Sequence, residues 1–273
     1  MTVSLYRLAT AFILLFVLHS SAIEARDLRL ATTTSTDNSG LLRAILPQFE
    51  RQRGIKVHVI SVGTGKALKL AENGDVDVVL VHDREAEEAF VAAGHGSERR
   101  DVMYNDFVLV GPKSDPAGVR GGSDVLAALR KIAATQARFV SRGDDSGTER
   151  MEQSYWRALD ITAQGRPWHI SAGLGMGEVL TMAGEMQAYT LSDRATYASY
   201  QARTELEILV QGDPRMFNPY GIMAVSRSKY PDINFSDALA LIDWMTSAAG
   251  RAAISAFKPK GEQLFFVAPA SKQ

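Results

Sequence analysis

The chain has 273 residues, of which 46% are hydrophobic and 22% charged, and its 30 basic and 31 acidic side chains leave a net charge of -1. This globular composition excludes a disordered polyelectrolyte, and the lack of a basic excess argues against nucleic acid or an anionic membrane as a partner. Because there is no cysteine, disulfides, thiol nucleophiles, cysteine-ligated zinc and cysteine-linked lipid anchors are excluded. Single cores usually split beyond about 250 residues, so the length predicts two lobes.

The first 22 residues have the layout of a secretory signal peptide. Arg7 precedes an apolar run at residues 9–18, and the small residues Ser20 and Ala22 follow. The run is shorter than the roughly 20 residues that span a bilayer. We expect a signal peptide at residues 1–22, with cleavage after Ala25 as the alternative, and a mature protein free in the periplasm without a lipid anchor.

Strands and helices alternate from there. Residues 28–31 (LRLA) predict a strand that leads into a hydroxyl-rich turn and then into a helix, which Pro47 should kink or shorten. The next predicted elements, in order, are a strand at 56–62, a helix at 66–73, a strand at 76–81, a helix at 84–93 and a strand at 102–110. This alternation predicts an α/β fold whose sheets are mixed but mostly parallel, with helices on both faces.

Two segments with linker composition divide the rest of the chain. Residues 113–122 are rich in Gly, Pro, Ser and Asp, and Asn218-Pro219 marks a second break. Between them we expect strands at 138–141, 188–191 and 206–210 and helices at 124–134, 149–159, 178–187 and 193–201; after them come a strand at 222–225 and helices at 235–246 and 248–257. Two crossings imply a discontinuous lobe 1 at residues 23–111 and 222–273, and a lobe 2 at 112–221.

Three turns share one design: residues 32–35, 61–65 and 142–148 each follow a strand, carry hydroxyl residues, in two cases with glycine, and open a helix. A helix N-terminus offers unpaired N–H donors and partial positive charge, glycine allows close approach to the backbone, and Ser or Thr adds an O–H donor. Any one turn alone is typical of an ordinary helix cap. Three of them at the carboxyl ends of strands predict an anion site.

Arg142 is the permanent cation among these turns. Its guanidinium fork matches a tetrahedral oxyanion, and the alternative is a salt bridge to Asp144 or Asp145. Residues 63–66 (GTGK) are followed by Ala67 where a nucleotide-binding loop requires Ser or Thr, and no second glycine lies at the right distance upstream. Ser146 has no recognisable triad partners, and the four histidines after residue 22 show no metal-ligand spacing. The sequence therefore predicts a binding protein rather than an enzyme, with no metal and no cofactor.

Seven stretches spread over nearly all of the mature chain carry a family resemblance. They are TTTSTDNSGLL (32–42), SVGTGKAL (61–68), GDVDVVLVHD (74–83), VMYNDFVLVGP (102–112), RGDDSGTE (142–149), GMGEVLTMAGEMQAYTLSDRATY (175–197) and NPYGIMAV (218–225). They resemble the tungstate-binding periplasmic proteins of ABC importers, within the phosphate- and molybdate-binding class of solute receptors. The resemblance implies a type II, two-lobed periplasmic-binding-protein clamp that encloses tungstate, and molybdate as well, and delivers it as a monomer to a membrane permease.

The resemblance also implies which residues touch the oxyanion. By matched position the contacts fall on Thr33, Thr34, Ser35, Ser61, Thr64, Arg142, Ser146, Gly147 and Thr148. Arg194 is a further candidate, although Ala195 stands where the resemblance leads us to expect glycine. Two alternatives stay open: a phosphate receptor of the same fold, since phosphate receptors have a similar Arg-x-Asp-x-Ser-Gly-Thr run, and a periplasmic hydrolase, which needs a nucleophile with its base or a metal cluster.

Overall fold

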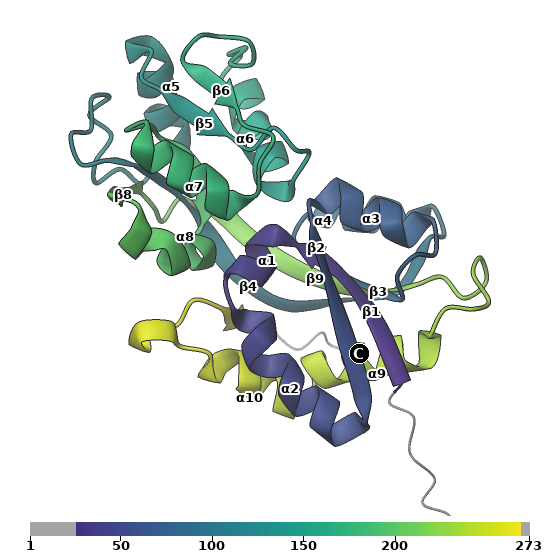
Figure 1. Ribbon diagram of the computed structural model, residues 1–273. Coiled ribbons are helices and arrows are strands. Elements are labelled where there is room, and N and C mark those ends of the chain that lie inside the picture. The colour runs from purple at the N-terminus through teal and green to yellow at the C-terminus, as the bar shows by residue number, and fades with distance from the viewer. Residues whose placement is uncertain (1–25, 269–273) are drawn as a thin grey trace, which may run out of the picture.

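The computed structural model describes residues 26–268, so the predicted signal peptide lies outside the described residues. A six-stranded path with the order β10-β4-β9-β3-β1-β2 forms the first part of the fold (Figure 1). Its strands are β1 Arg26–Thr33, β2 Ile55–Val62, β3 Val78–Val81, β4 Gly96–Pro112, β9 Phe217–Val225 and β10 Phe266–Val267. β1 pairs parallel with β2 and β3, whereas β3 pairs antiparallel with β9.

Helices cover both faces of this sheet because its strands are apolar on both sides. Along β3, Val78 and Leu80 enter one core and Val79 and Val81 enter the other, as the alternation of side chains along a strand requires. The first core is closed by α2 Leu41–Arg53, α9 Phe235–Thr246 and α10 Ala248–Ala256, and the second by α3 Thr64–Glu72 and α4 Arg84–Ala92. Figure 1 shows these two layers of helices on opposite sides of the sheet.

β4 continues into a second sheet. Up to Asp106 it pairs with β9, and from Phe107 it pairs antiparallel with β7 Thr190–Asp193 and with β8 Leu206–Val210. A parallel pair, β5 Phe139–Ser141 and β6 His169–Ser171, lies beside β7 through a bridge from Phe139 to Tyr189. This group forms lobe 2, and the part built on the first sheet forms lobe 1.

Lobe 2 has the same layered construction. Leu109 of β4 packs with α5 Val125–Thr135 and α6 Gly147–Ala158, and Val108 and Val110 pack on the other face with α7 Met176–Glu185 and α8 Arg194–Tyr200. The remaining helical segments are α1 Thr34–Asn38 and three short 3₁₀ turns, η1 Gln201–Arg203, η2 Pro214–Met216 and η3 Pro259–Gly261. No helix within residues 26–268 is long and apolar enough to cross a membrane.

The predicted α/β fold with mixed sheets is confirmed, and four local expectations need correction. Antiparallel pairs outnumber parallel ones, five to three, because the long strands β4 and β9 run antiparallel. Asn218-Pro219 lies within β9, so this second break is an extended strand and not a loop. Pro47 does not shorten α2, whose buried face runs on to Phe49. The short strands β6 and β10 were not predicted.

Asp213 fastens the start of α5 to the segment before η2. Hydrogen bonds from the Arg215 guanidinium and from the Val125 N–H lower the pKa of its carboxyl to about 2. Since this pKa is depressed on folding, the ionised group stabilises the fold above its ordinary pKa, and that contribution is lost as the pH falls through about 2. We expect Asp213→Asn to lower the free energy of unfolding at neutral pH by about 2 kcal/mol. Urea denaturation of both proteins at decreasing pH should show that the free energy of unfolding falls less steeply in the variant. An equal fall in the two proteins would contradict this role.

Candidate anion-binding site

The first predicted turn joins β1 to α1. The Thr33 hydroxyl caps its own helix, accepting from the Thr36 N–H at 3.2 Å and sharing a 2.8 Å hydrogen bond with the Thr36 hydroxyl. Thr34 instead faces lobe 2, where its hydroxyl oxygen accepts from Arg142 Nη2 at 3.3 Å. The Ser35 carbonyl accepts from the Thr196 hydroxyl at 3.0 Å. The turn therefore contacts lobe 2 through Thr34 and Ser35.

The second turn joins β2 to α3, beside the first. Ser61 pairs with Thr32 across the parallel strands β2 and β1, so both strands end at the same edge of the sheet. Gly63 occupies the cap position of α3. The fully buried Thr64 hydroxyl then accepts from the Gly147 N–H of lobe 2 at 3.1 Å. This is a third hydrogen bond between the lobes, and it brings the second and third turns together.

Arg142 begins the third turn, directly after β5, and is only 2% exposed. Its Nε donates to the Leu174 carbonyl at 2.8 Å, and its Nη2 donates to Asp144 at 2.5 Å as well as to Thr34. The predicted alternative, a salt bridge to Asp144, is thus present. It does not satisfy the guanidinium, because Nη1 is buried and has no hydrogen-bond partner in the described part of the chain.

The N-terminus of α6 completes the third turn. The Ser146 hydroxyl caps the helix by accepting from the Glu149 N–H at 3.2 Å. Gly147 lies so close to lobe 1 that an added Cβ would stand 3.3 Å from Thr64 Oγ1 and 3.4 Å from the His82 carbonyl. The Thr148 hydroxyl is buried without a partner among the described residues. Since an unpaired buried polar group costs about 1–3 kcal/mol, the unpaired donors of Arg142 and Thr148 are each available to an acceptor that a ligand would supply.

The two carboxylates of the third turn are bound by donors of their own lobe, and an Asp144 carboxylate oxygen also lies close to Gly63 of the second turn. Asp144 accepts from Arg142 and, at 3.2 Å, from the Ser146 N–H of its own turn. Asp145 pairs with Arg150 at 2.8 Å, and hydrogen bonding to that guanidinium lowers the pKa of the Asp145 carboxyl. The free groups described so far are therefore hydrogen-bond donors, which suits a fully ionised oxyanion.

Arg194 is occupied elsewhere. Its Nε and Nη2 each donate to the Asp106 carboxylate at 2.6 Å, and Nη2 also donates to Gln211 at 3.0 Å. This bidentate pairing joins α8 to β4, close to the point where β4 passes between the lobes. Ala195, found where glycine was expected, is fully buried. The guanidinium of Arg194 is thus bound to lobe-crossing residues and not to any of the three turns.

Sequence reasoning missed a buried polar chain at the lobe crossing. His82 Nδ1 lies 2.9 Å from Asn218 Oδ1, and the Asn218 amide donates to Asn105 at 2.6 Å. The Asn105 amide in turn lies 3.5 Å from the Asp193 carboxylate. Burial lowers the pKa of His82 and raises the pKa of Asp193. A usable signal was present in the sequence: Asn105 and Asn218 are polar residues inside otherwise apolar strands.

Gly143 holds the backbone of the third turn in a conformation that a side chain would strain. Its φ is +65°, and an added Cβ would stand 2.1 Å from the Ser171 hydroxyl oxygen. We expect Gly143→Ala to lower the free energy of unfolding by about 1–3 kcal/mol, measured in urea. Gly118→Ala is the matched control, because Gly118 has a φ of +59° with nothing within 4 Å. If the free energy of unfolding falls equally in both variants, the close packing against Ser171 does not contribute to stability.

Among residues 26–268 no group of three or more His, Asp or Glu side chains is arranged to hold a metal ion. A family model described as a PBP superfamily domain matches residues 20–249. The tungstate-binding protein TupA of Peptoclostridium acidaminophilum is 48% identical over 84% of this chain and 80% of its own length.

Two solved structures are also similar. The tungstate ABC transporter structure from Geobacter sulfurreducens is 51% identical, with a TM-score of 0.78, and the match covers 85% of this chain and 98% of that one. The tungstate-binding protein TupA from Desulfovibrio alaskensis G20 is 46% identical with a TM-score of 0.76, over 89% of this chain and 99% of that one. These matches extend over both lobes.

Proposed function

The chain belongs to the PBP superfamily, and from that premise we propose that it is an extracytoplasmic receptor that captures tungstate, and molybdate as well, and delivers it to the permease of an ABC importer. The observation that carries the ligand class is the pair of buried, unpaired donors on Arg142 and Thr148. The tungstate-binding relatives support the choice of oxyanion. The receptor is a periplasmic monomer released from its signal peptide, and it performs no catalysis.

We propose that the anion lies between the lobes, with the hydroxyls of Thr34, Ser35, Ser61, Thr64 and Thr148, the N–H groups around Gly147 and the guanidinium of Arg142 as its donors. Thr33 and Ser146 act differently, because their hydroxyls cap α1 and α6 and so fix the two helix N-termini. Arg194 holds the lobe crossing through Asp106. Strand pairing supports placing the crossings at 106–107 and 216–217, five residues before the limits that the sequence predicts.

Calorimetric titration with tungstate, molybdate, sulfate and phosphate tests the proposal. We expect tungstate to bind, molybdate to bind as well or less tightly, and phosphate and sulfate to be strongly disfavoured. Hydrogen phosphate carries a proton that needs an acceptor, and leaving that proton unpaired in a site lined by donors costs about 1–3 kcal/mol. Sulfate has no such proton, but its smaller cage of oxygens leaves the donors too far away for full-strength hydrogen bonds. Absence of tungstate binding would contradict the proposed function.

The Asp144→Asn variant separates tungstate from phosphate recognition. If Asp144 supplied the acceptor for a phosphate proton, wild-type protein would bind phosphate at micromolar levels and the variant would not. Because the carboxylate is bound by Arg142 and by the Ser146 N–H, we expect neither protein to bind phosphate at that level. The opposite result would establish the phosphate receptor instead.

A further inference from the structure

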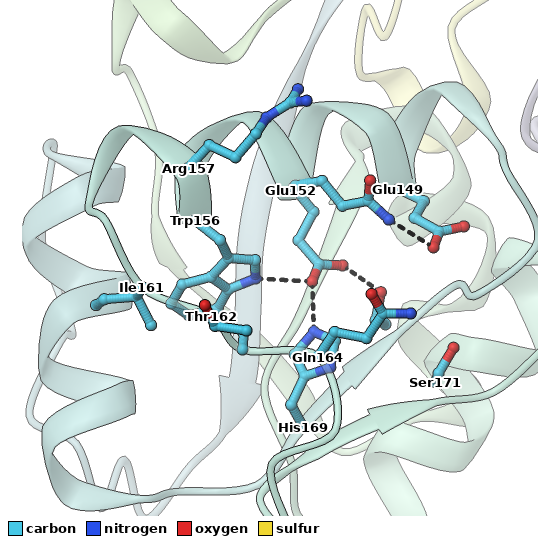
Figure 2. Close-up of a pocket in the computed structure, with 12 residues that line it drawn as sticks. Glu149, Glu152, Trp156, Arg157, Ile161, Thr162, Gln164, His169 and Ser171 are labelled. Atoms are coloured by element: carbon cyan, nitrogen blue, oxygen red, sulfur yellow. Dashed lines mark hydrogen bonds and ion pairs between the residues drawn. The ribbon is translucent and has the colours of Figure 1, made fainter.

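Glu152 is a buried carboxylate directly behind the anion-binding turns, and it contributes none of the proposed donors. It lies on α6 and is only 2% exposed. It accepts three short hydrogen bonds: from the Ser141 hydroxyl at 2.6 Å, from His169 Nε2 at 2.7 Å and from Trp156 Nε1 at 2.8 Å. Figure 2 shows Trp156 and His169 directed at this carboxylate. Both of its oxygens are therefore occupied.

These hydrogen bonds join three elements of lobe 2. Ser141 is the last residue of β5 and His169 is the first residue of β6, while Glu152 and Trp156 belong to α6. One carboxylate thus fixes the ends of two strands to the helix whose N-terminus carries Gly147 and Thr148.

The same two strands form the socket of Arg142, which immediately follows Ser141. The Ser141 carbonyl accepts from the Ala172 N–H at 3.0 Å, and the Arg142 carbonyl accepts from the Gly173 N–H at 2.8 Å. The guanidinium Nε then donates to the Leu174 carbonyl, three residues beyond β6. Any shift of β5 against β6 would consequently move the guanidinium relative to α6.

Close packing alone does not hold this socket. A cavity of about 210 Å³ lies beside Glu152 and is lined by residues of β5, α6 and β6, among them Trp156, His169 and Ser171 (Figure 2). His169 Nδ1 is buried without a partner among the described residues. Side chains next to an open space can relax into it when their hydrogen bonds are removed, so the directed bonds of the carboxylate are needed to keep the geometry.

We propose that Glu152 is the positioning residue of the anion site: by tying Ser141, His169 and α6 together, it holds the guanidinium of Arg142 at the distance from Thr148 that a tetrahedral oxyanion requires. The inference rests on the proposed function for its ligand, but the arrangement of Arg142 can be measured without any ligand. Burying a carboxylate is costly unless it is fully bonded, and here two of its three hydrogen bonds tie the strands of the socket to α6.

Tungstate titration of Glu152→Ala provides the first test. We expect affinity at least tenfold weaker with unchanged 1:1 stoichiometry. Glu152→Gln keeps an acceptor for Trp156 and His169 and can donate its amide to the Ser141 hydroxyl, so its affinity should stay within about threefold of wild type. Ile132→Ala, in the buried core under α5, is the control for stability: it should lower the melting temperature and leave affinity within twofold. Affinity in Glu152→Ala equal to that of this control would overturn the inference.

A double-mutant cycle shows whether the effect acts through Arg142. In an Arg142→Ala background, Glu152→Ala should weaken tungstate binding by less than a further twofold, because the group that it positions is gone. A full tenfold additional loss would overturn the inference. If Glu152→Ala does not fold, Ser141→Ala removes a single bond of the same carboxylate and should show a smaller loss in the same cycle.

A ligand-free measurement separates this inference from the proposed function. The Arg142 Nε–H, assigned in ¹⁵N NMR spectra by its disappearance in Arg142→Lys, should exchange slowly with solvent in wild type and in Glu152→Gln, and much faster in Glu152→Ala. Unchanged exchange in Glu152→Ala would overturn the positioning role even if tungstate binds. Wild-type protein that fails to bind tungstate would overturn the function, and the exchange rates would still decide the role of Glu152.

Discussion

Arg142→Ala is expected to fold and to bind tungstate about 3–5 kcal/mol more weakly, a factor of at least about a hundred. The side chain is almost fully buried and its Nη1 is unpaired, so the variant removes a charge that the site holds ready for an anion. It also leaves the Asp144 carboxylate without its cation, which adds repulsion toward an anion. Calorimetric titration alongside urea denaturation separates lost affinity from lost stability.

Arg194→Ala is the matched control for this prediction. It removes a guanidinium of the same size that is bound to Asp106 and Gln211. Its loss should lower the melting temperature but change tungstate affinity only a few-fold. If Arg194→Ala weakens binding as much as Arg142→Ala, Arg194 belongs to the site after all. If Arg142→Ala lowers only the stability, its role is structural and the proposed site is wrong.

Saturation with tungstate should stabilise the protein by about 4 kcal/mol at a thousandfold excess over the dissociation constant. For a chain of this size that corresponds to a rise of several degrees in melting temperature. The stabilisation is expected because the donors come from both lobes: Thr34 contacts Arg142, and Thr64 contacts Gly147. A bound anion adds hydrogen bonds on each side and so favours the closed arrangement.

Small-angle scattering tests the closure that this stabilisation implies. The radius of gyration should decrease when tungstate is added to ligand-free protein, whereas sulfate at equal ionic strength should leave it unchanged. Arg150 and Asp83 form an ion pair between the lobes at 3.1 Å, so Arg150→Ala should favour the open arrangement and enlarge the change seen on binding. No compaction at saturation would count against a two-lobed clamp.

Local features of the fold were within reach of the sequence. The apolar strands and amphipathic helices were located to within a few residues, including α9 at its observed limits. Short-range patterns suffice there because the spacing of apolar residues along a short segment indicates which faces of a helix or strand are buried. The limits of the two longer strands were not predicted: β4 extends over 17 residues, and β9 begins five residues before the predicted strand. Both pass between sheets, and their outer residues are ordered by partners distant in sequence.

The sequence by itself determined that three hydroxyl-bearing turns open helices after strands and that Arg142 stands at the start of one of them. Only the tertiary structure decided what each group does. Thr33 and Ser146 use their hydroxyls as caps, whereas Thr34 and Thr64 meet residues 108 and 83 positions away. Arg194 meets Asp106, 88 positions away, and so does not join Arg142 at the three turns. Helix capping depends on neighbours three residues apart. Pairing between the lobes depends instead on the register in which β4 and β9 cross, and a short segment of sequence cannot determine that register.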